Sequence, residues 1–423
     1  MKLLVIGSGG REHAIAKKFT ESSLVETVYC AKGNIGMKKD GIQLVDIAEN
    51  DHQALIHFAK SEKVAWTFIG PEIALFEGVV DAFDKAGLKV FGPNKKAADL
   101  ECSKEFAKDL MKKYAIPTAA YEIFEDYDAA LAYVEEQGVP IVIKADGLAA
   151  GKGVVVAMTL MEATNALSDM LLKGKFAASK PKVVIEEYLE GEEFSLFALV
   201  NGTKYYYTGV AQDHKRAYDG DKGPNTGGMG AYSPVPQVSE ALIQEVLGTV
   251  IKPTVNAMVA EARPFKGVIY AGLMMTKKGL RVIEFNARFG DPETQVILNQ
   301  LDSDLAQVID DILNGKDPVI KMHTDRYTLG VVVAAEGYPE KTVKDIPLPQ
   351  MNMEGSGCTI YHAGMKQGKS CLISDGGRIF FVAAQGSTLQ EAKDKAYHYL
   401  TNNPIAHTFY RFDIGEKAIQ FTK

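Results

Sequence analysis

Cysteine is scarce in this sequence, and the few that occur are scattered. The 423 residues contain four cysteines, with no CxxC spacing and no partner histidines. Zinc sites and disulfide frameworks need closely placed ligands or pairs, so the pattern argues against both. It predicts reduced thiols in a cytoplasmic protein instead. The four positions are Cys30, Cys102, Cys358 and Cys371.

Long apolar runs and a basic excess are also missing. No stretch approaches the roughly 20 apolar residues that a membrane-spanning helix needs, and the first residues read as a strand rather than a signal peptide. The net charge of −7 argues against a general nucleic-acid binder, which needs basic surface to neutralise phosphates. The 46% hydrophobic and 24% charged residues are typical of a soluble globular protein. We therefore expect a cytoplasmic protein without nucleic-acid or membrane partners.

The first hundred residues alternate short apolar runs with amphipathic stretches. This alternation predicts βαβ units around a parallel, Rossmann-like sheet. Two predicted strands end in Gly-Pro, at 70–71 and 92–93, so their loops lie along one sheet edge, where open α/β sheets bind ligands. The predicted strands are 2–6, 25–30, 65–69 and 89–91, and helices start near residues 12, 52 and 77.

The remaining pattern predicts further domains, in keeping with a length that suggests about two to four. A helix at 104–114 precedes mixed α+β segments, and the residues after 327 are strand-rich with one helix at 389–400. We expect an α/β and α+β multidomain protein with a separate small β-rich C-terminal domain. The predicted domains are 1–103, 104–325 with a lid subdomain at about 119–188, and 326–423.

The segment VIGSGGREHA at 5–14 combines a strand, a glycine turn and a helix start. The dinucleotide fingerprint G-x-G-x-x-G needs a third glycine where Glu12 stands, so that motif is incomplete. A helix N-terminus of this kind still suits an anion.

The segment IKADGLAAGKGVVV places Lys144 on a strand before a glycine-rich loop containing Gly151, Lys152 and Gly153. Such a backbone can approach phosphate oxygens while lysine supplies charge. It is not a P-loop, because a valine run follows instead of Ser/Thr and a helix. An ordinary hairpin loop is the equally good alternative.

The segment VVIEEYLEGEEFS follows a predicted strand with five acids in eight residues. These acceptors suit an adenine amino group and ribose hydroxyls, although a charge run by itself is more often a solvated face. Its position after the glycine loop favours the nucleotide interpretation.

In LRVIEFNARFGDPETQ, Glu284 and Asn286 are two apart on a strand and so project from one face, where two oxygen donors can hold a hard cation. Arg288 follows on that face, placed to meet a phosphate. The alternative is the polar face of an exposed strand.

In AQDHKRAYDGDKGPNTGGMGAYSP, three glycines within four residues indicate close approach to a ligand or a tight turn. Asp213, His214, Lys215 and Arg216 supply both signs of charge. We interpret the segment as a structureless loop of about 20 residues, a length that in compact proteins is usually functional.

Together these segments resemble the ATP-grasp superfamily and, within it, the phosphoribosylamine–glycine ligase family. The resemblance rests on GSGGREHA, KADGLAAGKGV, EEYLEGEEFS, QDHKRAYDGDKGPNTGGMGAYSP and FNARFGDPETQ, in this order from residue 4 to beyond 330. It implies ATP held between two α+β subdomains, and a monomeric enzyme of de novo purine synthesis. The implied reaction joins glycine to 5-phosphoribosylamine through glycyl phosphate.

The resemblance also implies residue roles on the ATP side. Lys104 and Lys144 would contact the phosphates, the 151–153 loop would close over them, and Arg288 would stabilise the transferring phosphoryl group. Glu284 and Asn286 would hold Mg²⁺ or Mn²⁺; the preceding strand, YAGLMMT, lacks the further carboxylate that many ATP-grasp enzymes place there. The residues implied around adenine and ribose are Glu186, Glu187, Leu189 and Glu193.

Glycine and phosphoribosylamine would bind beside them, with Asp213 and Lys215 also implied in catalysis. We expect Arg11 with Gly9 and Gly10 to form the phosphoribosylamine side, and Glu12 to be available to a ribose hydroxyl or the amine. The other residues expected at the substrates are Asn225, Thr226, Gly227, Gly228, Met229, Asp291, Pro292 and Glu293.

Three other interpretations compete with this one. They are a different ATP-grasp carboxylate–amine ligase, which would lack GPNTGGMGAYSP, a non-catalytic nucleotide-binding regulator, which would have lost Glu284, Asn286 or Arg288, and a Rossmann dehydrogenase. The sequence contains GPNTGGMGAYSP, which argues against the first interpretation, and it keeps Glu284, Asn286 and Arg288, which argues against the second. Glu12 in place of the third fingerprint glycine counts against the dehydrogenase.

Overall fold

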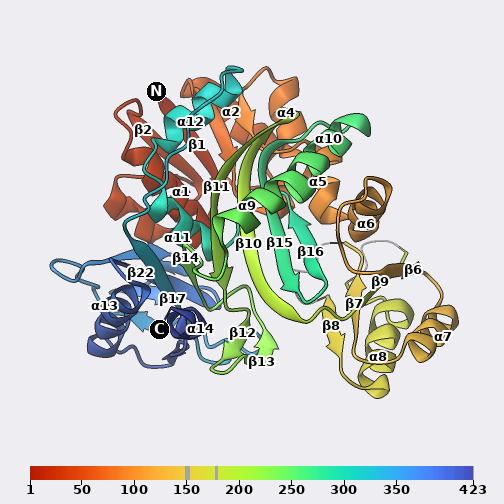
Figure 1. Ribbon diagram of the computed structural model, residues 1–423. Coiled ribbons are helices and arrows are strands. Elements are labelled where there is room, and N and C mark those ends of the chain that lie inside the picture. The colour runs from red at the N-terminus through yellow and green to blue at the C-terminus, as the bar shows by residue number, and fades with distance from the viewer. Residues whose placement is uncertain (148–152, 177–179, 423) are drawn as a thin grey trace.

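The computed structural model describes residues 1–147, 153–176 and 180–422. It begins with a five-stranded parallel sheet in the order β3-β2-β1-β4-β5, as the alternating pattern predicts (Figure 1). The strands are β1 (Lys2–Gly7), β2 (Thr27–Lys32), β3 (Gln43–Val45), β4 (Trp66–Ile69) and β5 (Val90–Phe91). The helices are α1 (Gly10–Thr20), η1 (Ile35–Asp40), α2 (His52–Ser61), α3 (Glu72–Glu77), α4 (Val79–Lys85) and α5 (Lys95–Cys102).

The four strands predicted in this region are confirmed, with shifts of up to two residues at their ends. The helix expected from about residue 77 differs: two short helices, α3 and α4, meet at Gly78, whose left-handed φ of 86° ends the first one. The three-residue β3 and the helix α5 were not predicted.

A second unit is a four-stranded antiparallel sheet in the order β6-β9-β7-β8, which has its own apolar core (Figure 1). It follows α6 (Lys104–Lys113) and projects from the rest of the molecule at the lower right of the view. Its elements are β6 (Tyr121–Phe124), α7 (Tyr127–Gln137), β7 (Ile141–Ala145), β8 (Val154–Ala157), α8 (Leu160–Leu167), η2 (Ser168–Leu172) and β9 (Val183–Glu187).

The largest sheet runs through the centre of the molecule in the order β16-β15-β10-β11-β14-β17-β22-β19, with β23 paired to β17. Its first half consists of long antiparallel strands whose buried faces share one core with α9 and α10. The elements of this half are β10 (Gly191–Asn201), β11 (Lys204–Asp213), β14 (Gly230–Ser233), α9 (Glu240–Val246), η3 (Leu247–Ile251), α10 (Lys252–Ala260), β15 (Lys266–Thr276), β16 (Gly279–Asn286), α11 (Glu293–Gln300) and α12 (Leu305–Leu313).

The C-terminal strands extend this same sheet, because β14 pairs with β17 from Gly230↔Val331 to Ser233↔Thr328. The C-terminal residues are thus joined to the central unit by backbone hydrogen bonds and by a shared apolar core. The three domain limits proposed above stay predictions. The elements are β17 (Tyr327–Ala335), β18 (Pro347–Leu348), β19 (Cys358–His362), β20 (Met365–Gln367), β21 (Leu372–Ser374), β22 (Arg378–Gly386), α13 (Leu389–Asn402), β23 (Thr408–Phe409) and α14 (Glu416–Phe421).

The interpretation of residues 211–234 as a structureless loop is wrong. The segment holds the hairpin β12 (Arg216–Tyr218) and β13 (Lys222–Asn225), and then β14 of the central sheet. Glycine density suggested a loop, yet long-range pairing with β17 and contacts from the C-terminal residues give the segment defined structure.

Helices of the described ranges are all too short or too polar to span a bilayer.

Candidate functional site

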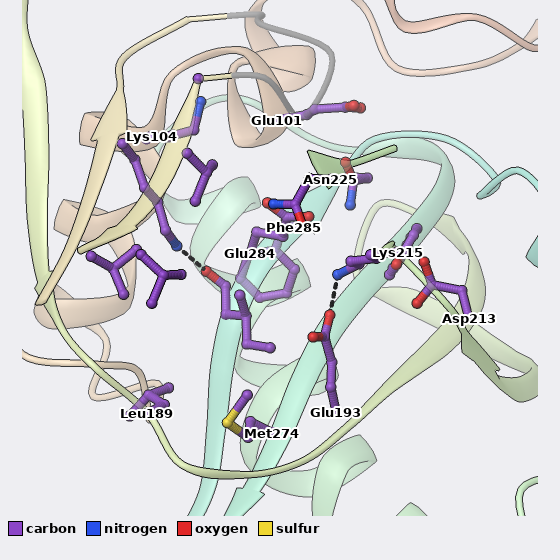
Figure 2. Close-up of a pocket in the computed structure, with 18 of the residues that line it drawn as sticks. Glu101, Lys104, Leu189, Glu193, Asp213, Lys215, Asn225, Met274, Glu284 and Phe285 are labelled. Carbon is purple, nitrogen blue, oxygen red and sulfur yellow. Dashed lines mark hydrogen bonds and ion pairs between the residues drawn. The ribbon is translucent and has the colours of Figure 1, made fainter. Parts of the chain in front are cut away.

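A cavity of about 750 Å³ opens where the units of the chain meet. The parallel sheet and its helices contribute Arg11 and Glu72, the four-stranded sheet contributes Lys144, the central sheet contributes Glu284, and β22 contributes Arg378. Figure 2 shows charged side chains from several of these units around one space. The fold therefore brings together residues that lie far apart in the sequence.

Most residues predicted for ATP and for the substrates line this one cavity. The residues assigned to ATP and those assigned to the substrates thus surround one cavity. The lining residues among those predicted are Arg11, Lys104, Lys144, Gly153, Glu186, Glu187, Leu189, Glu193, Asp213, Lys215, Asn225, Thr226, Gly227, Glu284, Asn286, Arg288, Asp291 and Glu293.

Other predicted residues lie elsewhere. Met229 is fully buried in an apolar core, and two residues of the glycine loop, Gly151 and Lys152, lie outside the described residues. The predicted residues that do not line the cavity are Gly9, Gly10, Glu12, Gly228, Met229 and Pro292.

Glu12 has a structural task that the sequence analysis missed. Its carboxylate accepts from the backbone N–H of Gly9 at 2.8 Å and from Arg11 Nε at 2.5 Å, so it caps α1. A Cβ placed on Gly70 would lie 2.1 Å from Glu12 Oε1, which explains why position 70 of the Gly-Pro dipeptide is a glycine. The carboxylate is therefore occupied within the turn, which corrects the expectation that it is available to a substrate.

Glu186 bridges two lysines on the cavity wall. Its carboxylate lies 2.8 Å from Lys144 Nζ and 2.9 Å from Lys108 Nζ, and all three side chains are buried. Burial lowers the pKa of Lys108 to about 8, against the opposing charge of Glu186. Glu186 thus positions the lysine expected at the phosphates, and the adenine and ribose contact predicted for it stays a prediction.

Arg288 is held by two carboxylates that the sequence analysis did not identify. Its Nε lies 3.2 Å from Glu72 Oε2 and its Nη2 lies 2.9 Å from Glu101 Oε1. Although burial opposes the shift, the charges of Arg288 and Arg11 lower the pKa of Glu72 to about 2. Glu72 follows the Gly-Pro break of β4, so the predicted ligand edge of the parallel sheet was the signal that could have found it.

Asp213, Lys215 and Glu193 form a second charged cluster. Lys215 Nζ forms an ion pair with Glu193, drawn as a dashed line in Figure 2. Burial raises the pKa of Asp213 to about 8, helped by the negative charges of Glu293 and Glu193 and opposed by Lys215. This raised pKa brings the titration of Asp213 closer to neutral pH, where a carboxyl group can donate or accept a proton.

Glu284 and Asn286 offer oxygen atoms to a cation from the end of β16. Burial opposes ionisation of Glu284, but the nearby charges of Lys215, Lys144 and Lys104 hold its pKa below the ordinary value. Among the described residues, Asn286 Oδ1 accepts one hydrogen bond, a long one of 3.4 Å from Arg288 Nη2. Within the described residues no group of three or more His, Cys, Asp or Glu gathers to form a protein-only metal site. The pair fits a cation that takes its remaining ligands from phosphate and water.

Arg378, on β22, joins two segments of the site and was not predicted. Its Nη1 donates to the carbonyls of Gly227 and Asp291, both at 2.7 Å, and its Nη2 lies 3.3 Å from Asp291 Oδ2. A single arginine far from any motif gives no sequence signal. Its contacts nevertheless tie the glycine-rich segment to the residues before α11.

Comparisons with known proteins agree with this geometry. Models of the phosphoribosylglycinamide synthetase N domain, ATP-grasp (A) domain and C domain match residues 1–101, 102–294 and 328–417. A phosphoribosylamine–glycine ligase of Streptococcus pneumoniae is 56% identical over 423 residues, 99% of this chain and 100% of that one. One of Streptococcus pyogenes is 54% identical over 422 residues, with the same coverage.

Solved structures extend the likeness. The crystal structure of phosphoribosylamine–glycine ligase from Thermotoga maritima aligns with a TM-score of 0.83 at 33% identity, over 98% of this chain and 100% of that chain. A biotin carboxylase domain from Hydrogenobacter thermophilus, 15% identical with a TM-score of 0.71, shares the fold over 100% of this chain and 98% of that one. Domain models in the expected order and full-length relatives above half identity show that the chain belongs to the phosphoribosylglycinamide synthetase family.

Proposed function

We propose that the chain ligates glycine to 5-phosphoribosylamine with ATP, giving glycinamide ribonucleotide, ADP and phosphate in de novo purine synthesis. The observation that carries this proposal is the single cavity lined by both the ATP residues and the substrate residues of the family pattern. The names and full-length coverage of the relatives support it.

The chemistry follows from the poor reactivity of a carboxylate. An oxygen of glycine attacks the γ-phosphorus of ATP, the bond to ADP breaks, and glycyl phosphate forms. The amine of phosphoribosylamine then attacks the acyl carbon, phosphate leaves, and the nitrogen loses a proton. Lys144 and Arg288 face the cavity as fixed positive charges for the transferring phosphoryl group. Asp213, with a pKa of about 8, is suited to proton transfer near neutral pH.

Glu284 and Asn286 would hold Mg²⁺ or Mn²⁺. A bound metal would supply positive charge to neutralise the phosphates of ATP. The charges of Lys215, Lys144 and Lys104 favour the ionised form of Glu284, which supports this assignment. The lysines and the cation would then both lie next to the phosphates of ATP.

The test is ADP formation with glycine and phosphoribosylamine supplied together or singly. Activity that needs both substrates supports the ligase, and ATP hydrolysis that ignores glycine contradicts it. Arg288→Ala is expected to keep ATP binding and lose most turnover, whereas the control Arg281→Ala, on β16 just before Arg288 but outside the cavity lining, keeps both. Unchanged turnover in Arg288→Ala rules out the phosphoryl role.

We also propose that the protein acts as a cytoplasmic monomer, as the family resemblance implies. Sedimentation of the full chain measures this directly, and a dimer at assay concentrations contradicts it.

A further inference from the structure

The cavity is lined by many cations, and most of them are already neutralised. Within the described residues, seven of the nine lysines and arginines that line it have a carboxylate oxygen within 4.0 Å. Lys104 and Arg216 are the two without one. The neutralised side chains are Arg11, Lys108, Lys144, Lys215, Arg288, Arg378 and Lys417.

Lys104 belongs to the nucleotide side. It starts α6, and its Nζ donates to the carbonyl of Gly147 at 2.8 Å, at the entrance to the glycine loop expected at the ATP phosphates. Figure 2 shows Lys104 and Lys215 on opposite sides of Glu284. Arg216 begins β12 directly after Lys215, so Lys104 and Arg216 come from different elements of the cavity wall.

Arg216 carries a charge that its protein contacts leave uncancelled. It begins β12, faces Asn225 across the hairpin, and its Nη1 donates to the carbonyl of Gly223 at 2.9 Å. A carbonyl orients the guanidinium but is neutral, so the remaining donors and the net charge are available to an anion. Planar guanidinium donors match the oxygens of a phosphate group.

The backbone of Arg216 is fixed by the C-terminal residues. Buried Arg411 donates from Nη1 to the Arg216 carbonyl at 3.1 Å and to Asp221 Oδ1 at 3.0 Å. The same guanidinium forms a two-point pair with Asp413 at 2.7 Å for each contact. Asp413 in turn accepts from the N–H of Gly220 in the hairpin turn at 2.9 Å. The hairpin is therefore held in place before any substrate binds.

We propose that Arg216 binds the 5′-phosphate of the ribosylamine substrate, so that the β12–β13 hairpin forms the phosphate subsite. This inference rests on the proposed function and moves the phosphate away from the glycine turn. Arg11, the cation expected there, is buried with its charge offset by Glu12 at 2.5 Å and Glu72 at 3.8 Å. The reaction has two phosphate-bearing substrates, and among the described lining residues two cations, Lys104 on α6 and Arg216 on β12, lack a carboxylate oxygen within 4.0 Å.

The experiment compares Arg216→Met, Arg216→Lys and the control Lys222→Met. Lys222 lies on the same hairpin, exposed and outside the cavity lining, so its variant removes the same charge without the proposed contact. Arg216→Met is expected to raise the KM for phosphoribosylamine roughly 10- to 100-fold, the size of a charge-assisted hydrogen bond. The KM values for ATP and glycine should change less than about twofold by the same reasoning, and Arg216→Lys should recover part of the loss.

A second measurement does not need turnover. Ribose 5-phosphate is expected to bind the intact protein and Lys222→Met with equal affinity by calorimetry and to bind Arg216→Met more weakly, whereas unphosphorylated ribose should not distinguish the three. An unchanged KM for phosphoribosylamine, an equal rise in the KM for ATP, or undiminished ribose 5-phosphate binding by Arg216→Met overturns the proposal. Failure of the ligase function is separate, because it appears as absent glycine-dependent activity in the intact protein.

Discussion

Replacing Glu186 by glutamine tests the charged wall of the cavity most directly. Gln keeps the shape of the side chain and removes its charge, which leaves the buried ammonium groups of Lys108 and Lys144 facing a neutral amide. The exposed fraction of Glu186 is 4% and that of Lys108 is 2%, so water compensates poorly for the lost carboxylate. Removing one partner of a buried ion pair costs about 3–5 kcal/mol in unfolding free energy.

The loss should depend on pH in a defined direction. The pKa of Lys108 is already lowered to about 8, and without Glu186 it falls further. A lysine with a lowered pKa destabilises the folded state below the unfolded value of 10.5, and the penalty shrinks as pH rises. At pH values between the lowered pKa of Lys108 in the variant and about 8, the folded variant has lost the Lys108 proton, whereas the folded intact protein still holds it. The gap to the intact protein should therefore narrow by about 1.4 kcal/mol per pH unit up to pH 8, and then stay level.

Urea unfolding of the full chain at several pH values between 7 and 9 measures both effects. Glu122→Gln is the matched control, since Glu122 lies exposed on β6 of the same sheet and its loss should change the unfolding free energy by less than about 0.5 kcal/mol. A loss below about 1 kcal/mol at pH 7 for Glu186→Gln, or a gap that does not change between pH 7 and pH 8, would refute the reasoning.

Three other substitutions probe the surrounding structure. Because the raised pKa of Asp213, about 8, makes the intact protein lose stability as pH rises from about 4 to 8, Asp213→Asn should flatten that decline in pH-dependent unfolding; an unaltered slope contradicts the burial argument. Arg411→Met should cost about 2–4 kcal/mol in denaturant unfolding and raise the KM for phosphoribosylamine, because the hairpin loses its anchor; full stability rules out the anchor. Gly70→Ala forces Glu12 from its cap and should lower stability by about 1–3 kcal/mol; an unchanged melting temperature excludes this clash.

The sequence predicted elements that have strong local signals. Apolar runs placed four strands of the parallel sheet, and the Gly-Pro ends of two of them indicated its ligand edge. β3 escaped prediction because three residues carry no period. The β12–β13 hairpin escaped because its shape depends on Arg411 nearly 200 positions away, while its local composition, rich in glycine and charge, is that of a loop.

The residues of the candidate site also differ in whether a local sequence pattern predicts them. Contiguous motifs led to Lys144, Glu284 and Arg288, all of which line the cavity. Isolated partners such as Lys108 and Arg378 have no neighbouring pattern, so their contacts exist only in three dimensions. Glu12 failed for another reason, because one glutamate after a glycine turn suits a ligand and a helix cap equally well in sequence.

The cations that line the cavity fall into two groups, those paired with a carboxylate and those without one. A cation fixed by a carboxylate, as Arg288 is by Glu101, keeps its geometry in the absence of substrate but contributes little net attraction. Arg216 has no carboxylate oxygen within 4.0 Å among the described residues and keeps more of its charge for an anion, and Lys104 has none either, although the charges of Glu284 and Asp146 act on it. We therefore expect the paired residues to orient the reacting groups, and the proposed phosphate contacts of Lys104 and Arg216 to contribute more to the initial capture of substrates. Since salt screens the attraction of half-buried cations for an anion in solution more than it screens buried pairs, added salt should weaken substrate capture more than the chemical step.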